Sequence, residues 1–96
     1  MAFAMLICEL HLPAARSLKA KRRVVKGLID RMHSRFRVSI AETDFHDLHQ
    51  RTQISIAAVD GTPSRLERLL EDLRDLAERS DDALVVRWDV EWVESE

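Results

Sequence analysis

The chain has 96 residues, 46% of them hydrophobic, and this size predicts one domain, residues 1–96, with a single core. Its one cysteine, Cys8, excludes an intrachain disulfide and a cysteine-rich zinc site, and it favours a reducing compartment. The apolar N-terminus lacks a basic segment and is interrupted by Glu9, which argues against a signal peptide and a membrane span, so we expect a cytoplasmic protein.

The net charge of −2 conceals a strong asymmetry along the chain. Residues 16–37 contain nine Lys or Arg and one acidic residue, whereas residues 38–96 contain six Arg and fifteen acidic residues. The charge of the whole chain says nothing about partners, but a segment with a local charge of +8 favours an anionic one.

The first predicted elements are a strand and a helix. Residues 3–12 alternate and have one fully apolar face, and Pro13 ends this strand. Residues 17–35 form the predicted helix, with Ser17 as its N-cap. Apolar residues recur along it at helical spacing and form its expected buried stripe: Leu18, Val25, Leu28, Ile29 and Met32.

Two strands, a helix and a last strand follow. Residues 36–43 and 51–59 alternate, with a polar connection at 44–49 between them and a turn at 60–63. Residues 64–79 are the clearest helix, because Ser64-Arg65-Leu66-Glu67 is a capping-box pattern followed by leucines at helical spacing. The last strand, residues 83–93, is expected to place five apolar side chains on one face: Leu84, Val86, Trp88, Val90 and Trp92.

The element order β-α-β-β-α-β determines the expected fold. With right-handed crossovers, the compact solution is an α+β domain in which two helices cover one face of a four-stranded antiparallel sheet. This is the ferredoxin-like split βαβ arrangement. We expect the first and third strands at the centre of the sheet and the second and fourth at its edges.

The basic segment is the main candidate site. Cations favour the C-terminal end of a helix because the macrodipole makes the N-terminus positive, yet here they crowd the first turns. The helix at 64–79 mixes both signs and can form i,i+4 pairs, whereas the helix at 17–35 has one acidic residue. A solvated surface, a site for RNA phosphates and a site for an acidic protein surface all stay open. The candidate phosphate-binding residues are Ser17, Lys19, Lys21, Arg22, Arg23 and Lys26.

The composition restricts the kind of RNA contact that is expected. Residues 51–59 contain no aromatic residue, which argues against an RNA-recognition-motif surface. Gly27 and Gly61 are the only glycines, which excludes a GxxG loop, a P-loop and a dinucleotide-binding fingerprint. We therefore expect contacts to the backbone and shape of RNA, without base stacking and without sequence readout of DNA.

No set of residues has the pattern of a catalytic site, so we expect a non-enzymatic protein without a cofactor. Glu9 and His11 are suited to act as an acid–base pair, but an exposed strand end explains them equally well. Residue types that bind metals cluster at 42–49, yet the spacing of His46 and His49 imposes no geometry in a loop. We expect a polar connection there and no metal site.

Two apolar groups favour self-association. Trp88 and Trp92 share a face of the last strand, where they pack in the core or, at a sheet edge, anchor a dimer. Phe3, Met5 and Ile7 lie on a strand face that is unusually apolar for one that no helix covers. The alternative function is a homo-oligomer, with a dimer as the expected state, whose basic helix contacts an acidic surface such as residues 81–96 of a neighbouring subunit.

Five motifs, in chain order, resemble those of the bacterial YlxP-like family. They are Glu9-Leu-His-Leu-Pro13, Ser17-Leu-Lys-Ala-Lys-Arg-Arg23, Val38-Ser-Ile-Ala-Glu42, Asp47-Leu-His-Gln-Arg51 and Trp88-Asp-Val-Glu-Trp92. The resemblance covers nearly the whole chain and implies a ferredoxin-like fold in a bacterial cytoplasmic protein. Relatives encoded beside translation-initiation and ribosome-maturation factors imply a role linked to RNA or the ribosome. The chain departs from the family at His49, where an aromatic residue is frequent.

Overall fold

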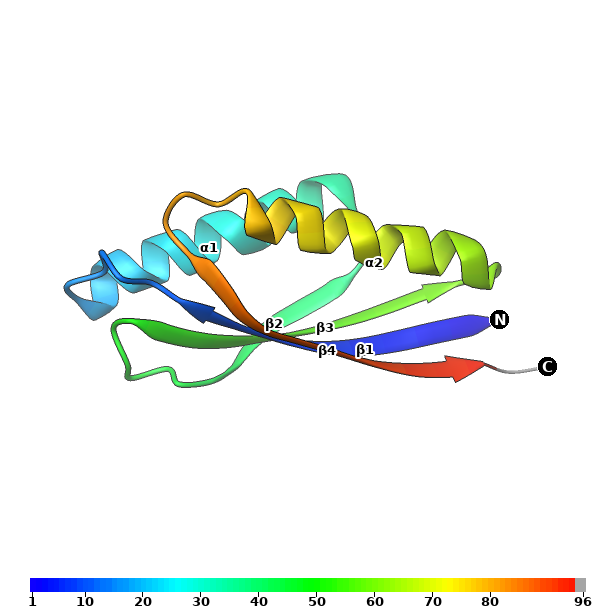
Figure 1. The fold of residues 1–96 in the computed structure, drawn as a ribbon, viewed down its shortest axis with the longest axis horizontal. Helices are drawn as coiled ribbons and strands as arrows, with labels where there is room; N and C mark the ends of the chain where they lie inside the picture. Colours follow the sequence, from blue (N-terminus) through cyan, green and yellow to red (C-terminus); the bar gives the residue numbers. More distant parts are fainter. Residues whose placement is uncertain (95–96) are drawn as a thin grey trace.

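The computed structural model describes residues 1–94 and confirms the predicted topology. The elements in chain order are β1 (Ala2–His11), α1 (Leu18–Arg35), β2 (Ser39–Asp44), β3 (Arg51–Asp60), α2 (Pro63–Glu78) and β4 (Leu84–Glu94). The strands form one antiparallel sheet in the order β2-β3-β1-β4, so β1 and β3 are central. Both helices lie on one face of this sheet (Figure 1).

The core lies between the sheet and the two helices. Alternate side chains of β1 and β3 point toward the helices, as the two-residue period of a strand requires, and the apolar stripe of each helix covers them. Burial raises the pKa of the Cys8 thiol to about 12, so this cysteine behaves as a small core hydrophobe. Among the fully buried side chains are Leu6, Leu10, Leu28, Met32, Ile54, Leu66 and Leu73.

The two helices begin in different ways. Ser17 caps α1 as predicted, and its Oγ accepts a hydrogen bond from the Ala20 backbone N–H at 3.0 Å. The prediction of a capping box at 64–67 is wrong, because α2 begins at Pro63 and its N-cap is Thr62. The Thr62 side chain makes no capping hydrogen bond. Proline favours the first helical position, so Ser64 already lies inside the helix.

A β-bulge changes the face that the first residues of β4 present. The partner of Glu9 is Arg87 and the partner of Leu10 is Val85, so the pairing register shifts between them. An extra residue in one strand interrupts the alternation of its side chains. The prediction that Leu84 and Val86 share the face of Trp88 is therefore wrong, and these two side chains are 57% and 59% exposed.

The second face of the sheet, here called the open face, is not covered by a helix within residues 1–94 (Figure 1). It is apolar near the start of β1, at Phe3 and Met5, and polar near its end, at Glu9 and His11. The molecule measures 47 × 21 × 18 Å, so these two halves lie toward opposite ends of an elongated body. Neither helix in this part of the chain is long and apolar enough to cross a membrane.

Candidate functional site

Four exposed side chains on α1 form what we call the basic face: Lys19, Arg22, Arg23 and Lys26. Their i, i+3, i+4, i+7 spacing places them along one side of the helix. Lys26 Nζ lies 2.9 Å from Asp30 Oδ2, and this hydrogen bond raises the pKa of Lys26. The other three side chains make no ion pair with any residue that the structure describes. The basic face is therefore a cationic surface with little internal neutralisation.

Ser17 lies at the start of α1, close to the basic face in sequence. Its Oγ is already the acceptor of the capping bond from Ala20. A serine hydroxyl also carries one donor proton, so Ser17 can give a hydrogen bond to an anion at the helix N-terminus.

Lys21 does not belong to the basic face, and the prediction that it binds phosphate is wrong. Its side chain is fully buried, with Nζ 2.8 Å from Glu42 Oε2. Nζ also donates to the backbone carbonyl oxygens of Phe45 at 2.6 Å and His46 at 3.4 Å. These three acceptors occupy all three donors of the ammonium group. A phosphate at the surface therefore finds no free donor on Lys21.

The sequence contained a signal for this buried lysine that the prediction missed. Positions 18, 21, 25, 28 and 32 follow one another at alternating steps of three and four, and every one except position 21 holds an apolar residue. A lysine on a buried stripe needs an internal partner, because an unpaired buried charge is strongly unfavourable. Glu42 of β2 is that partner.

Glu42 extends this contact from α1 to the sheet. Its Oε2 also accepts a hydrogen bond at 2.5 Å from Oγ1 of Thr52, a fully buried residue of β3. Partial burial raises the pKa of the Glu42 carboxyl, but the hydrogen bonds from Lys21 and Thr52 outweigh this effect and hold the pKa below its usual range. The charged pair thus connects α1 to both β2 and β3.

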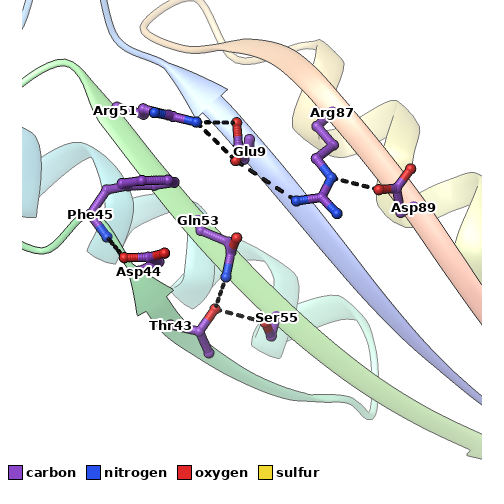
Figure 2. Close-up of polar contacts among 9 residues, drawn as sticks. All are labelled: Glu9, Thr43, Asp44, Phe45, Arg51, Gln53, Ser55, Arg87 and Asp89. Carbon is purple, nitrogen blue, oxygen red and sulfur yellow. Dashed lines mark hydrogen bonds and ion pairs between the residues drawn. The ribbon is translucent and has the colours of Figure 1, made fainter.

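The buried lysine also positions the connection between β2 and β3. Phe45, whose carbonyl Lys21 binds, has a φ of 62°, a left-handed conformation that phenylalanine rarely adopts. Its backbone N–H donates to Asp44 Oδ1 at 2.7 Å. Its ring lies against the Arg51 guanidinium, whose carbon is 3.7 Å from the ring centroid (Figure 2). A residue of the helix thereby holds an aromatic ring beside the open face, an arrangement that sequence reasoning did not find.

The polar half of the open face is neutralised by its own residues (Figure 2). Arg51 Nη2 donates to both carboxylate oxygens of Glu9, at 3.2 and 3.1 Å. Arg87 lies 3.9 Å from Glu9 and donates to Asp89 at 2.5 Å. Both arginines are engaged, so this surface is not a second free cationic patch.

The structure separates the residues that the sequence suggested for catalysis and metal binding. His11 Nδ1 lies 3.0 Å from the Gln50 carbonyl oxygen, while Glu9 binds arginine, so the two do not form an acid–base pair. His46 Nε2 lies 3.2 Å from the Glu42 carbonyl oxygen. No group of three His, Cys, Asp or Glu side chains among the described residues is placed to hold a metal ion.

The residues predicted for an oligomer interface lie on both faces of the sheet. Phe3, Met5 and Ile7 lie on the open face, where Met5 is 54% exposed and the other two are half-buried. Trp88 and Trp92 pair with buried positions of β1 and face the helices. Trp88 packs against the core, whereas Trp92 is 45% exposed. One flat contact cannot include both groups, so an interface that uses them must involve the edge at β4.

Comparisons with known proteins place this fold and these motifs among relatives. Residues 3–90 match a family described as "Protein of unknown function (DUF503)". The chain is 41% identical over 64 residues to "Uncharacterized protein YlxP" of Bacillus subtilis (strain 168), which covers 67% of this chain and 70% of that protein. Both matches agree with the family resemblance drawn from the sequence motifs.

A solved structure supports the fold independently. A de novo designed protein with a ferredoxin fold, determined by solution NMR, superposes with a TM-score of 0.57 at 15% identity. The similarity covers 94% of this chain and 85% of the designed one. At this identity the likeness concerns the fold alone, and it confirms the predicted ferredoxin-like arrangement.

Proposed function

The chain belongs to the DUF503 family of proteins of unknown function, and we propose that it is a non-enzymatic accessory protein that binds RNA phosphates through the basic face of α1. The proposal includes a cytoplasmic location and an association with the ribosome. Its contacts are the four side chains of the basic face together with the Ser17 hydroxyl. Lys21 takes no direct part.

The observation that supports this proposal is the set of exposed cations at Lys19, Arg22 and Arg23, which form no ion pair with any described residue. Like charges three and four residues apart on a helix repel, so these side chains weaken α1 by a few tenths of a kcal/mol per pair. In α2 the exposed Arg74 instead pairs with Glu78 at 2.8 Å. A surface that carries such repulsion without compensation is suited to an anionic partner that removes it.

The number of cations sets the expected strength of binding. Each phosphate that a cation neutralises releases counterions, so the logarithm of the affinity falls linearly with the logarithm of the salt concentration. Contacts limited to phosphates give dissociation constants of roughly 10⁻⁴–10⁻⁶ M at physiological salt. We therefore expect weak, salt-sensitive binding without preference for sequence.

Filter binding of purified ribosomal RNA across a salt series tests the proposal. Binding should weaken steeply as salt rises, and Arg22→Glu/Arg23→Glu should lower the affinity and flatten the salt dependence. Arg68→Glu/Arg79→Glu, which changes the net charge equally at exposed positions on and just after α2, is the matched control and should bind as the parent does. Absence of binding by the parent protein at low salt would reject RNA binding.

A second candidate function, a homodimeric interaction module, is favoured by the edge at β4. This strand has eleven residues, contains neither lysine nor proline, and pairs only with β1 within the described chain. A long edge strand offers unpaired backbone groups to another chain, and the bulge that twists β4 lies at its first residues, away from Trp92. Trp92 and Val93 near its end are 45% and 39% exposed. Of the acidic segment 81–96 considered as a partner surface, Ser95 and Glu96 lie outside the described residues.

Light scattering during size-exclusion chromatography tests the dimer. We expect a dimer that Trp92→Lys dissociates, because a charge replaces an exposed apolar side chain near the edge. If Arg22→Glu/Arg23→Glu dissociates it instead, the basic face is the contact and an acidic protein surface is its partner. A parent protein that is monomeric at high concentration removes this candidate.

A further inference from the structure

We infer that the RNA held by the basic face is base-paired, and that α1 contacts the phosphate lines of an A-form duplex without gripping an unpaired base. This inference rests on the proposed RNA-binding function and names the class of RNA.

The basic face is a short, rigid row. Lys19 and Lys26 are seven residues apart, which corresponds to about 10 Å along a helix axis, and Arg22 and Arg23 lie between them. All four belong to one unbroken helix of 18 residues. A duplex offers phosphates at fixed positions that such a row can contact without ordering either partner. A flexible single strand must lose conformational freedom to do the same.

Two phenylalanine rings adjoin α1, and each of them already has an arginine against it. The Phe45 ring is covered on one side by the Arg51 guanidinium at 3.7 Å. Phe36, at the opposite end of α1, is half-buried, with the Arg35 guanidinium 5.5 Å from its ring centroid. Proteins that bind single strands without sequence preference combine a cationic groove with aromatic side chains on which bases stack. The basic face has the cations without the stacking rings.

The open face does not supply a single-strand site either. On a sheet that binds single-stranded RNA, aromatic side chains of the central strands stack the bases. Here β1 and β3 place two side chains with rings on this face, Phe3 and His11; both are half-buried, and His11 Nδ1 lies 3.0 Å from the Gln50 carbonyl oxygen. The two arginines on this face, Arg51 and Arg87, are bound to Glu9 and Asp89. The arginines of this face are therefore engaged, whereas the basic face of α1 gathers three cations that pair with no residue that the structure describes.

Shape favours the same conclusion. The minor groove of A-form RNA is wide and shallow, and proteins recognise duplex RNA there through phosphates and 2′-hydroxyl groups, largely without regard to sequence. A single exposed helix with cations on its outer side can lie across that groove. Ser17, at the start of the helix, adds one hydroxyl donor beside the row.

The test compares one RNA in two states. Fluorescence anisotropy is measured with a 20-base-pair RNA duplex and with each of its separated strands, whose sequences are chosen to avoid internal pairing, between 50 and 200 mM salt. We expect the duplex to bind at least tenfold more tightly than either strand. With four phosphate contacts, affinity should fall about 100-fold over this salt range.

Variants locate the contact. Arg22→Glu/Arg23→Glu should lower duplex affinity at least tenfold and roughly halve the salt slope, because two of four phosphate contacts are lost. Arg68→Glu/Arg79→Glu should change it less than twofold, and circular dichroism should show that both variants are folded. If the strands bind as tightly as the duplex, the inference is wrong although RNA binding stands. If neither duplex nor strands bind at 50 mM salt, the proposed function itself fails.

Discussion

The two helices cover the same face of one sheet, yet they use charge in opposite ways. In α2 the buried stripe is entirely apolar, and on its outer side Arg74 pairs with Glu78. In α1 a charged residue, Lys21, occupies the buried stripe, while three of the four cations of the basic face have no ion-pair partner within residues 1–94. The helix with the most positive charge therefore has one cation inside and most of the others without acidic partners outside.

This difference distinguishes the charged side chains that stabilise the fold from those that do not. A helix that only covers a sheet is stabilised by an apolar stripe and by alternating charges, and α2 has both. The exposed cations of α1 do not contribute to the packed core. The buried lysine stabilises α1 only because Glu42 and two backbone carbonyl groups accept hydrogen bonds from its Nζ. Departures from local preference often mark a functional surface, and in this chain the departures in the placement of charge lie on α1.

The largest expected effect comes from removing the buried cation. Lys21→Met leaves Glu42 with only its hydrogen bond from Thr52 and removes the side-chain donor to the Phe45 carbonyl. Breaking a buried ion pair costs about 3–5 kcal/mol, and we expect the lower end of this range because the Glu42 side chain is 19% exposed. Urea unfolding measures the loss. Lys26→Met, which removes an exposed lysine paired with Asp30 on the same helix, should change the free energy of unfolding far less, because an exposed ion pair contributes little.

A double variant shows whether the pair itself is responsible. The double variant Lys21→Met/Glu42→Met also removes the Glu42 charge that Lys21→Met leaves without a cation. It should recover most of the lost stability, because replacing a buried ion pair with apolar residues often leaves stability unchanged or raises it. A cost for Lys21→Met alone that is as small as that for Lys26→Met would contradict the role assigned to the buried lysine.

Acid should weaken the same contact. The pKa of Glu42 is held below its usual range by Lys21 and Thr52, despite the opposing effect of burial. A carboxyl with a lowered folded pKa stabilises the protein above its unfolded pKa, about 4.3, and this stability disappears as the pH falls through the folded value. The parent should exceed Glu42→Gln in stability at pH 7, and the gap should narrow below about pH 5. Unfolding at pH 7, 5, 4 and 3 measures it, and a gap that is constant throughout would contradict the assignment.

The fold was predictable because it depends on periodicity. The alternation of β1 and β3 and the leucines of α2 repeat at the spacing of their elements, and each set turned out to face the core. These patterns, together with right-handed crossovers, also predict that both helices cover the same face of the sheet. Errors arose where one residue interrupts a pattern, as at the bulge of β4 and at Pro63.

The candidate site was only partly predictable, because charge alone does not show where a side chain points. Lys19, Lys21 and Arg22 look alike in a basic segment, but position 21 falls on the line of Leu18 and Val25 and is therefore buried. Its partners come from β2 and the connection after it, which are twenty or more residues away in sequence. Such long-range pairing leaves no local pattern, and neither does the contact between Phe45 and Arg51.

The starts of the two helices provide a smaller contrast. Ser17→Ala removes the acceptor of the Ala20 N–H and should cost about 1 kcal/mol, the usual value for losing a serine N-cap. Thr62→Ala should cost distinctly less, because the Thr62 side chain makes no capping bond. Urea unfolding of both variants measures the difference. Equal costs would mean that the capping bond of Ser17 contributes nothing to stability.

The smallest effect bears most directly on why α1 is so basic. Arg22→Glu/Arg23→Glu replaces repulsion with attraction, since residue 22 then pairs with Lys26 and residue 23 with Lys19, each four positions apart. The gain in unfolding free energy should be about 0.5–1 kcal/mol. The same variant is expected to lose RNA binding, so stability and binding should move in opposite directions. If the reversal instead destabilises the protein by a similar amount, the cations support the fold, and the basic face loses its main argument for a partner.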